Sequence, residues 1–192
     1  MRKAEYTRKT KETDITLSLC LDGGEVEVST GIGFFDHMLT ALFFYAGFGA
    51  RLSVKGDLHV DGHHTVEDTG IAIGLAFKQA LGDKAGITRF ASAYVPMDEA
   101  LCLSVLDISG RPFCVFEADM PQEIIGGYES WLTGEFMRAF AASAAVTLHQ
   151  SKVRGENSHH ITEALFKSLG LCLKTAVAVT GRGVISTKGV ID

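Results

Sequence analysis

Paired histidines followed by a glutamate occur twice in this chain of 192 residues, in the segments His63–Glu67 and His159–Glu163. On a helix, the first histidine and the glutamate of each segment stand at positions i and i+4, on one face, where together they can hold a metal ion. The second histidine, His64 or His160, is rotated by about 100° and faces elsewhere. The spacing therefore predicts that each segment serves two ions, with a histidine–glutamate pair for one and a single histidine for the other.

Two further residues are candidate ligands because of where they stand relative to these segments. His37 precedes His63 by 26 residues, and Glu135 precedes His159 by 24 residues, each near the expected start of an earlier helix. A histidine at such a position can instead cap a helix, and a solvated helix position suits Glu135 equally well. Nitrogen and carboxylate donors without thiolate suit Mn, Fe, Co, Ni or Zn.

An internal duplication relates the two segments. The stretches GHHTVEDTGIAIGLAFK and SHHITEALFKSLGLCLK align without a gap at an offset of 96 residues. Identical pairs include His63/His159, His64/His160, Glu67/Glu163, Gly74/Gly170 and Lys78/Lys174. Two copies are few for a solenoid, so the repeat favours a fold with pseudo-twofold symmetry.

The elements that must position these residues follow from the spacing of apolar side chains. In the first half, alternation around an Asp-Gly-Gly turn predicts a hairpin over 14–30. Helical spacing predicts helices over 34–46 and 63–81, and short strands are expected at 52–54 and 58–60 between them.

The second half repeats this order. A strand, a turn and a strand are predicted over 91–108, and a further strand over 113–117. A helix over 131–144, a strand over 146–153 and a helix over 161–177 complete the half. We expect His59 and His149 to lie on strands and to be structural.

Together these elements predict an α+β fold of two duplicated halves, each a mixed β-sheet with helices packed on one face. The pseudo-repeats cover about 11–87 and 88–180. No Pro-rich or Gly/Ser-rich linker separates them, so residues 1–192 are expected to form a single domain.

Composition narrows the function classes. A hydrophobic content of 46% and a net charge of -5 are typical of a globular protein, and the absence of a basic stripe argues against nucleic acid as a partner. The four cysteines are scattered, which favours buried, reduced thiols. The chain begins with a charged stretch, and its most apolar run, Met38–Phe48, is too short to span a bilayer. We therefore expect a cytoplasmic protein with no membrane partner.

Six blocks of the sequence resemble, in order, those of the imidazoleglycerol-phosphate dehydratase family. They are GIGFFDHMLTAL, DLHVDGHHTVEDTGIAIG, GITRFASAYVPMDEAL, SGRPF, NSHHITEALFK and STKGV, and the resemblance runs from about residue 11 to Val190. It implies a fold like domain 2 of ribosomal protein S5. It also implies a carbon–oxygen lyase, a hydro-lyase that dehydrates D-erythro-imidazole glycerol phosphate to imidazole acetol phosphate in histidine biosynthesis.

The resemblance further implies two Mn(II) ions per active site, for which other divalent metals can substitute, and no organic cofactor. One ion would take His37, His64, His159 and Glu163, and the other would take His63, Glu67, Glu135 and His160. Metals on both ring nitrogens of the substrate would stabilise an imidazolate, which can expel the neighbouring hydroxyl. Members of the family form homo-oligomers of 24 subunits with sites between subunits.

Catalytic and substrate-binding roles come from the same resemblance. Glu12, Glu67 and Glu163 are the acid–base candidates, and which of them is the base stays open. The implied substrate contacts are Glu12, His37, Tyr45, His63, Glu67, Arg89, Arg111, His159, Lys167, Ser186 and Lys188, of which the cationic residues and Ser186 would surround the phosphate. Three positions depart from the usual pattern, because many relatives carry Gln at Ala41, His at Tyr45 and His at Glu135.

Two other functions fit the paired histidines. A non-catalytic assembly could use metal ions only to join subunits, and a dinuclear hydrolase could use the same ligands. The first would not need a phosphate pocket, so Arg89, Arg111 and the Ser186–Lys188 segment favour the enzyme. The second lacks a recognisable base and leaving-group site.

Overall fold

The first half of the chain forms a four-stranded sheet and two helices in the computed structural model, which describes residues 1–181, 183–189 and 191. The elements are β1 (Lys3–Lys9), β2 (Thr13–Cys20), β3 (Val26–Ser29), α1 (Gly33–Ala46), β4 (Gly49–Gly56) and α2 (His63–Leu81). The strand order is β1-β2-β4-β3, with antiparallel pairs except for β3, which runs parallel to β4. Val190, where the family resemblance ends, lies outside the described residues.

The second half repeats this architecture. Its elements are β5 (Phe90–Met97), β6 (Ala100–Asp107), β7 (Phe113–Glu117), β8 (Ile124–Ile125), β9 (Tyr128–Glu129), α3 (Leu132–Ala144), β10 (Thr147–Arg154) and α4 (Ser158–Ala176). The order β5-β6-β10-β7 has the same strand directions as the first sheet. The predicted α+β fold of two similar halves is confirmed, and the sequence indicated neither the hairpin β8–β9 nor the strand β1.

The predicted hairpin over 14–30 is wrong. β2 and β3 both lie in the first sheet, but β4 lies between them and pairs with each. Gly23 and Gly24 have φ angles of 106° and 138°, and this turn carries the chain across the end of β4 instead of back along β2. Alternating apolar residues show which face of a strand is buried, but they do not specify its partner.

The true partner of β2 is β1, which the sequence presented only as a charged leader. β1 is an edge strand with a single fully buried residue, Ala4, so its apolar alternation is weak. Its inward residue Arg8 donates from Nη2 to Asp68 Oδ1 of α2 at 2.8 Å. An ion pair thus joins this edge strand to the helical layer.

The strand predicted at 58–60 is also wrong, because these residues form a turn in which the Val60 amide donates to the Asp57 carbonyl. Leu58 and Val60 are exposed, and His59 lies in this turn and not on a strand. His149 does lie on a strand, β10, with an exposed side chain. The other predicted ranges agree with the structure to within a few residues.

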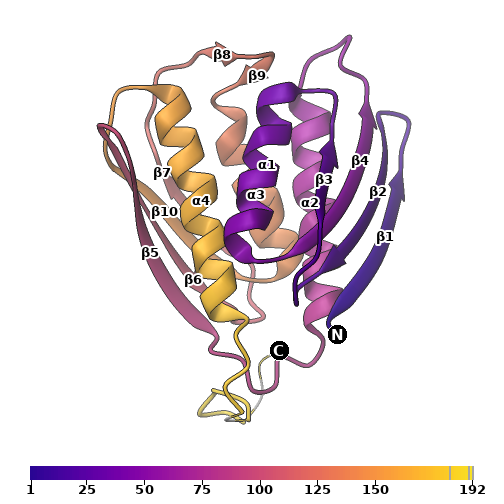
Figure 1. Ribbon diagram of the computed structural model, residues 1–192, viewed down its shortest axis with the longest axis vertical. Helices are drawn as coiled ribbons and strands as arrows, with labels where there is room; N and C mark the ends of the chain where they lie inside the picture. Colours follow the sequence, from indigo (N-terminus) through magenta and orange to yellow (C-terminus); the bar gives the residue numbers. More distant parts are fainter. Residues whose placement is uncertain (182, 190, 192) are drawn as a thin grey trace.

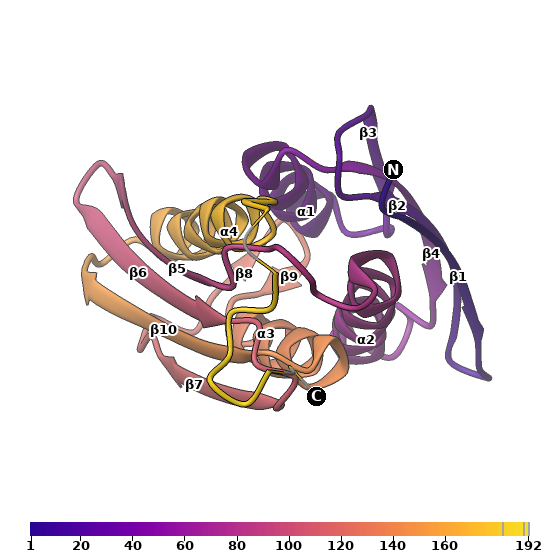
Figure 2. The ribbon, with the colours of Figure 1, turned by 90° about the horizontal axis from the view of Figure 1, so that it is seen from below.

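Four helices fill the space between the two sheets (Figures 1 and 2). α1 packs on α4 and α2 packs on α3, so each helix pair joins the two halves. The duplicated glycines explain how closely these pairs approach. A Cβ on Gly74 would lie 2.7 Å from the Phe140 carbonyl oxygen, and one on Gly170 would lie 2.7 Å from that of Leu42.

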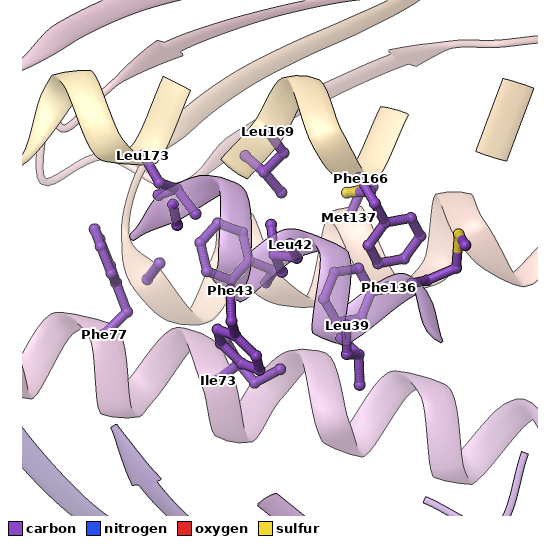
Figure 3. Packing of buried hydrophobic residues seen from close by; sticks show 14 of the residues in the cluster. Leu39, Leu42, Phe43, Ile73, Phe77, Phe136, Met137, Phe166, Leu169 and Leu173 are labelled. Carbon is purple, nitrogen blue, oxygen red and sulfur yellow. The ribbon is translucent and has the colours of Figure 1, made fainter. Parts of the chain in front are cut away.

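One hydrophobic core therefore serves both halves. Buried side chains of all four helices meet in it, among them Phe43 of α1, Phe77 of α2, Phe136 of α3 and Phe166 of α4 (Figure 3). The rings of Phe136 and Phe166 stack with their centroids 5.1 Å apart. Among the described residues, no helix has the length and apolar character needed to cross a bilayer.

Candidate metal centre and basic pocket

The first turns of the four helices lie at one end of the molecule, the upper end in Figure 1. Each of these turns carries candidate metal ligands: His37 on α1, the first histidine pair on α2, Glu135 on α3 and the second histidine pair on α4. α4 begins three residues earlier than predicted because the Asn157 side chain accepts hydrogen bonds from the amides of His159 and His160. This cap places the second pair in a regular helical turn. We call this end the metal end.

Three predicted ligands come together where α1 meets α4. His37 Nε2 lies 3.3 Å from Glu163 Oε2, and His159 Nε2 lies 3.2 Å from the same oxygen. Ligand atoms of these three residues all lie within 4.8 Å of one another, and no other group of three His, Cys, Asp or Glu residues meets this condition in the described part of the chain. Two nitrogens and one carboxylate form a donor set suited to a divalent transition metal.

Glu163 is buried, and Lys167 on the next turn of α4 pairs with its other oxygen, Nζ to Oε1, at 2.6 Å. Burial opposes ionisation of Glu163, but Lys167 and the two histidines outweigh it, so the pKa of this carboxyl lies below its usual range. Lys167 Nζ also lies 5.6 Å from the ring centroid of Tyr45. Two predicted substrate contacts, Tyr45 and Lys167, are therefore neighbours of the cluster, whereas Ala41 is buried in the core.

The equivalent place on the other helix pair, where α2 meets α3, is less complete. His63 Nε2 and Glu67 Oε2 lie 3.7 Å apart. Glu135 stands in the first turn of α3, as His37 does on α1, but its Oε1 accepts from Arg138 Nη2 at 2.6 Å. The predicted pair of His63 and Glu67 is thus confirmed as neighbours, while Glu135 is held by a residue of its own helix.

His64 and His160, the second histidine of each pair, turn to other carboxylates. His64 Nδ1 lies 3.0 Å from Asp57 Oδ2, and its Nε2 lies 3.9 Å from Glu12 Oε1. The hydrogen bond to Asp57 raises the pKa of His64.

His160 has the corresponding arrangement in the second half. Its Nδ1 lies 2.7 Å from Glu99 Oε2, and its Nε2 lies 3.7 Å from Asp98 Oδ2. The hydrogen bond to Glu99 raises the pKa of His160, and His160 is in turn the main reason why the pKa of Glu99 is lowered to about 2. Sequence reasoning missed Asp57, Asp98 and Glu99, because they lie outside the aligned repeat and come from two different loops.

Neither predicted ligand set is complete within one chain. Of the first set, His64 lies apart from the cluster on α1 and α4. Of the second set, His160 and Glu135 have other partners than the pair on α2. In both sets the separated histidine is the one that helical geometry turns away from its neighbour.

A basic pocket forms at the other end of the molecule. Its volume is about 260 Å³, and its lining residues are Arg89, Ser109, Arg111, Ser186, Thr187, Lys188 and Ile191. Arg89 is fixed there, because its guanidinium bonds both oxygens of Asp107 and the carbonyl of Ile185. Four of the five residues expected around the phosphate, two arginines, a lysine and a serine, therefore line one pocket. The fifth, Lys167, lies outside it, because it pairs with Glu163 on α4.

The basic pocket and the metal end lie at opposite ends of α4. The amide of Arg89 donates to the carbonyl of Ala176, the last residue of α4, whereas His159 stands in its first turn. These residues are 17 positions apart, which corresponds to about 26 Å of helix. A small molecule cannot reach both ends of one chain at once.

Comparison with known proteins identifies the family. The sequence profile of imidazoleglycerol-phosphate dehydratase matches residues 30–173. A protein of that name from Carboxydothermus hydrogenoformans is 53% identical over 192 residues, covering 100% of both chains. The chain belongs to the imidazoleglycerol-phosphate dehydratase family. Another member, from Gluconobacter oxydans, is 55% identical over 194 residues, covering 99% of this chain and 98% of its own.

Solved structures of imidazoleglycerol-phosphate dehydratases have the same fold. The enzyme from Staphylococcus aureus superposes with a TM-score of 0.85 at 35% identity, covering 93% of this chain and 99% of its own. The enzyme from Pyrococcus furiosus superposes with a TM-score of 0.85 at 40% identity, covering 96% of this chain and 99% of its own. The chain is thus a hydro-lyase of histidine biosynthesis that dehydrates imidazole glycerol phosphate, which selects the enzyme over the metal-binding assembly and the hydrolase.

Proposed function

We propose that the dehydration takes place at a dinuclear Mn(II) site that different subunits of a homo-oligomer complete together, with 24 subunits as the family resemblance implies. One observation carries this proposal: the metal end and the basic pocket lie about 26 Å apart along α4. The imidazole ring and the phosphate of the substrate are separated by only three carbons. A pocket from one chain must therefore meet the metal end of another.

The side chains at the metal end fit divalent ions. His37, His159 and Glu163 would hold one ion with His64 of another chain, and His63, Glu67 and Glu135 would hold the second with another chain's His160. When bound, such ions polarise an imidazole ring and stabilise negative charge on it, a chemistry that needs no organic cofactor. Mn(II) is the proposed ion, and the donor set also accepts other divalent metals.

The substrate phosphate is the proposed ligand of the basic pocket. Arg89 is anchored with its guanidinium in place, while Arg111 and Lys188 add positive charge, and the Ser186 hydroxyl can donate a hydrogen bond. Binding the phosphate there orients the three-carbon chain towards the metal end of the neighbouring subunit. Lys167 pairs with Glu163 of the metal end and lies beside Tyr45, so both side chains can contact the substrate from the helices below the ligands.

Glu12 is the acid–base candidate that the geometry favours. Glu163 is held by Lys167 and two histidines, and Glu67 faces His63. Glu12 lies in the turn between β1 and β2, and in the described part of the chain its carboxylate has only the His64 ring, at 3.9 Å, as an ionic partner. An exposed carboxylate beside a ligand ring is free to move a proton to or from the substrate.

Mixing two inactive variants tests the shared site. Glu163→Gln damages the metal end, and Arg111→Ala damages the basic pocket. The two variants are mixed without metal, so that their oligomers dissociate, and Mn(II) is then added so that mixed oligomers form. We expect turnover to return, because some sites then combine an intact metal end with an intact pocket. As a matched control, Arg111→Ala mixed with Lys188→Ala damages the same pocket in every chain and should stay inactive. No recovery in the first mixture, with the mixed oligomer formed, would contradict the proposal.

We also propose the cytoplasm as the compartment of this reaction. The four cysteines are free, and burial raises the pKa of the Cys102 and Cys172 thiols to about 12. Reduced thiols of this kind are typical of cytosolic proteins. Cell fractionation with an antibody to the protein tests this directly.

A further inference from the structure

We infer that Asp57 and Glu99 are positioning residues, which fix His64 and His160 so that the Nε2 atom of each ring faces outward as a metal donor. This inference rests on the proposed metal site. Neither carboxylate belongs to the predicted ligand sets, and each contacts a single histidine ring.

The contacts of Asp57 define the orientation of His64. Both of its carboxylate oxygens lie close to His64 Nδ1, at 3.0 and 3.2 Å. An ionised carboxylate can only accept, so Nδ1 must carry the hydrogen and donate it. The lone pair of the neutral ring is then on Nε2, which lies on the far side from Asp57. A histidine that donates one ring N–H to a carboxylate is oriented for metal binding through its other nitrogen.

Glu99 plays the same part for His160 by a different route. Its Oε2 lies 2.7 Å from His160 Nδ1, while its Oε1 accepts from the amides of Glu156 and Asn157 at 3.2 and 2.9 Å. One carboxylate therefore ties the turn between β5 and β6 to the start of α4 and sets the direction of the ring. Because Oε1 holds the backbone at the start of α4, Glu99 also has a structural role. The test must distinguish this role from its effect on the His160 ring.

The two positioning residues are not copies of one another. Asp57 follows β4 in the first half, whereas Glu99 lies in the turn between the first two strands of the second half. The residue of the first half in that kind of turn is Glu12, which lies 3.9 Å from His64 Nε2 instead of Nδ1. Each histidine of the duplicated pair thus acquired its own carboxylate, and both rings present the same nitrogen.

Titration of the oligomer with Mn(II), followed by the electron paramagnetic resonance signal of the free ion, tests the inference. Asp57→Ala should lower the affinity for one of the two ions by about 10- to 100-fold. Asp57→Asn keeps a hydrogen-bond acceptor and should lower that affinity less. Glu99→Gln should weaken the other ion. Its amide oxygen can still accept from the backbone, while its NH₂ group cannot accept from Nδ1 and selects the wrong tautomer. The control Glu27→Gln removes an exposed ion pair with Arg51 and should leave both ions unchanged.

The outcomes separate this inference from the proposed function. Two ions in the wild type with unchanged affinities in both Asp57→Ala and Glu99→Gln would overturn the positioning role and leave the shared metal site standing. A wild type that binds no Mn(II) would overturn both. Circular dichroism and thermal unfolding of the metal-free variants check the fold, and if Asp57→Ala does not fold, the Asn and Gln variants decide the question.

Discussion

The two helix pairs at the metal end start from the same duplicated sequence but have different surroundings. Where α1 meets α4, the Glu163 side chain is 8% exposed and pairs with Lys167. Where α2 meets α3, the equivalent Glu67 is 46% exposed, and the position equivalent to Lys167 is Ile71. The duplication has kept the helical spacing of the ligands and changed what stands around them.

This difference indicates that one half-site is preorganised and the other is not. The carboxylate on α4 already faces two histidine nitrogens, so little side-chain movement is needed before an ion is bound. On the other pair, Glu135 must leave Arg138 before it can act as a ligand. We therefore expect the ion on α1 and α4 to bind more tightly than the ion on α2 and α3.

Removing the metal should have the largest effect. Stepwise addition of a chelator should release the ion on α2 and α3 first, and complete removal should abolish dehydration and dissociate the oligomer. Turnover, bound Mn(II) and light scattering during the same titration measure these steps. Normal turnover in metal-free protein would contradict the metal mechanism, and simultaneous loss of both ions would contradict the difference between the helix pairs.

The close helix contacts at Gly74 and Gly170, in contrast, should contribute equally to stability in the two helix pairs. In Gly74→Ala and Gly170→Ala, the new methyl group would lie 2.7 Å from a backbone oxygen of the neighbouring helix. We expect each substitution to lower the free energy of unfolding by about 1–3 kcal/mol, because overpacking outweighs the gain in helix propensity. Urea unfolding measures this, with Gly33→Ala, where a Cβ meets nothing within 4 Å, as the control. A stabilised variant would show that the helices can move apart at little cost.

The buried carboxylate should make stability depend on pH in the metal-free protein. The pKa of Glu163 is lowered in the folded state, so its contribution to stability is present above the unfolded pKa of about 4.3 and is lost as pH falls through the folded pKa. Urea unfolding of wild type and Glu163→Gln between pH 3 and 6 checks the sign. As the pH falls, the free energy of unfolding of the wild type should decrease relative to that of Glu163→Gln. A difference between the two free energies that does not depend on pH would contradict the expectation.

Freeing Glu135 should have the smallest effect. Arg138→Ala removes an ion pair between exposed side chains at i and i+3, which is worth at most about 0.5 kcal/mol. The ion on α2 and α3 should therefore bind no more than about twofold more tightly. Mn(II) titration measures this gain in affinity. The double variant with Arg138→Ala and Glu135→Gln should not show the gain. Weaker binding in the single variant would show that Arg138 supports the site.

Much of the metal end could be predicted from helical spacing. His63 with Glu67 and His159 with Glu163 are neighbours as expected, and His64 and His160 turn away as expected, because these relations depend on one helix alone. The strand order could not be predicted in the same way, since the alternation in β2 and β3 does not reveal that β4 lies between them. Asp57 and Glu99 were missed because a carboxylate in a loop carries no spacing signal towards a distant ring.

The sequence by itself determined the duplication, the helices and the ligand pairs within them, because these depend on interactions between residues a few positions apart. Only the tertiary structure decided that α1 meets α4 across the two halves, which brings His37 to Glu163 over 126 positions. It also decided that the basic pocket and the metal end lie at opposite ends of α4. Such placements depend on how buried surfaces of distant elements pack together, and local spacing does not specify that packing.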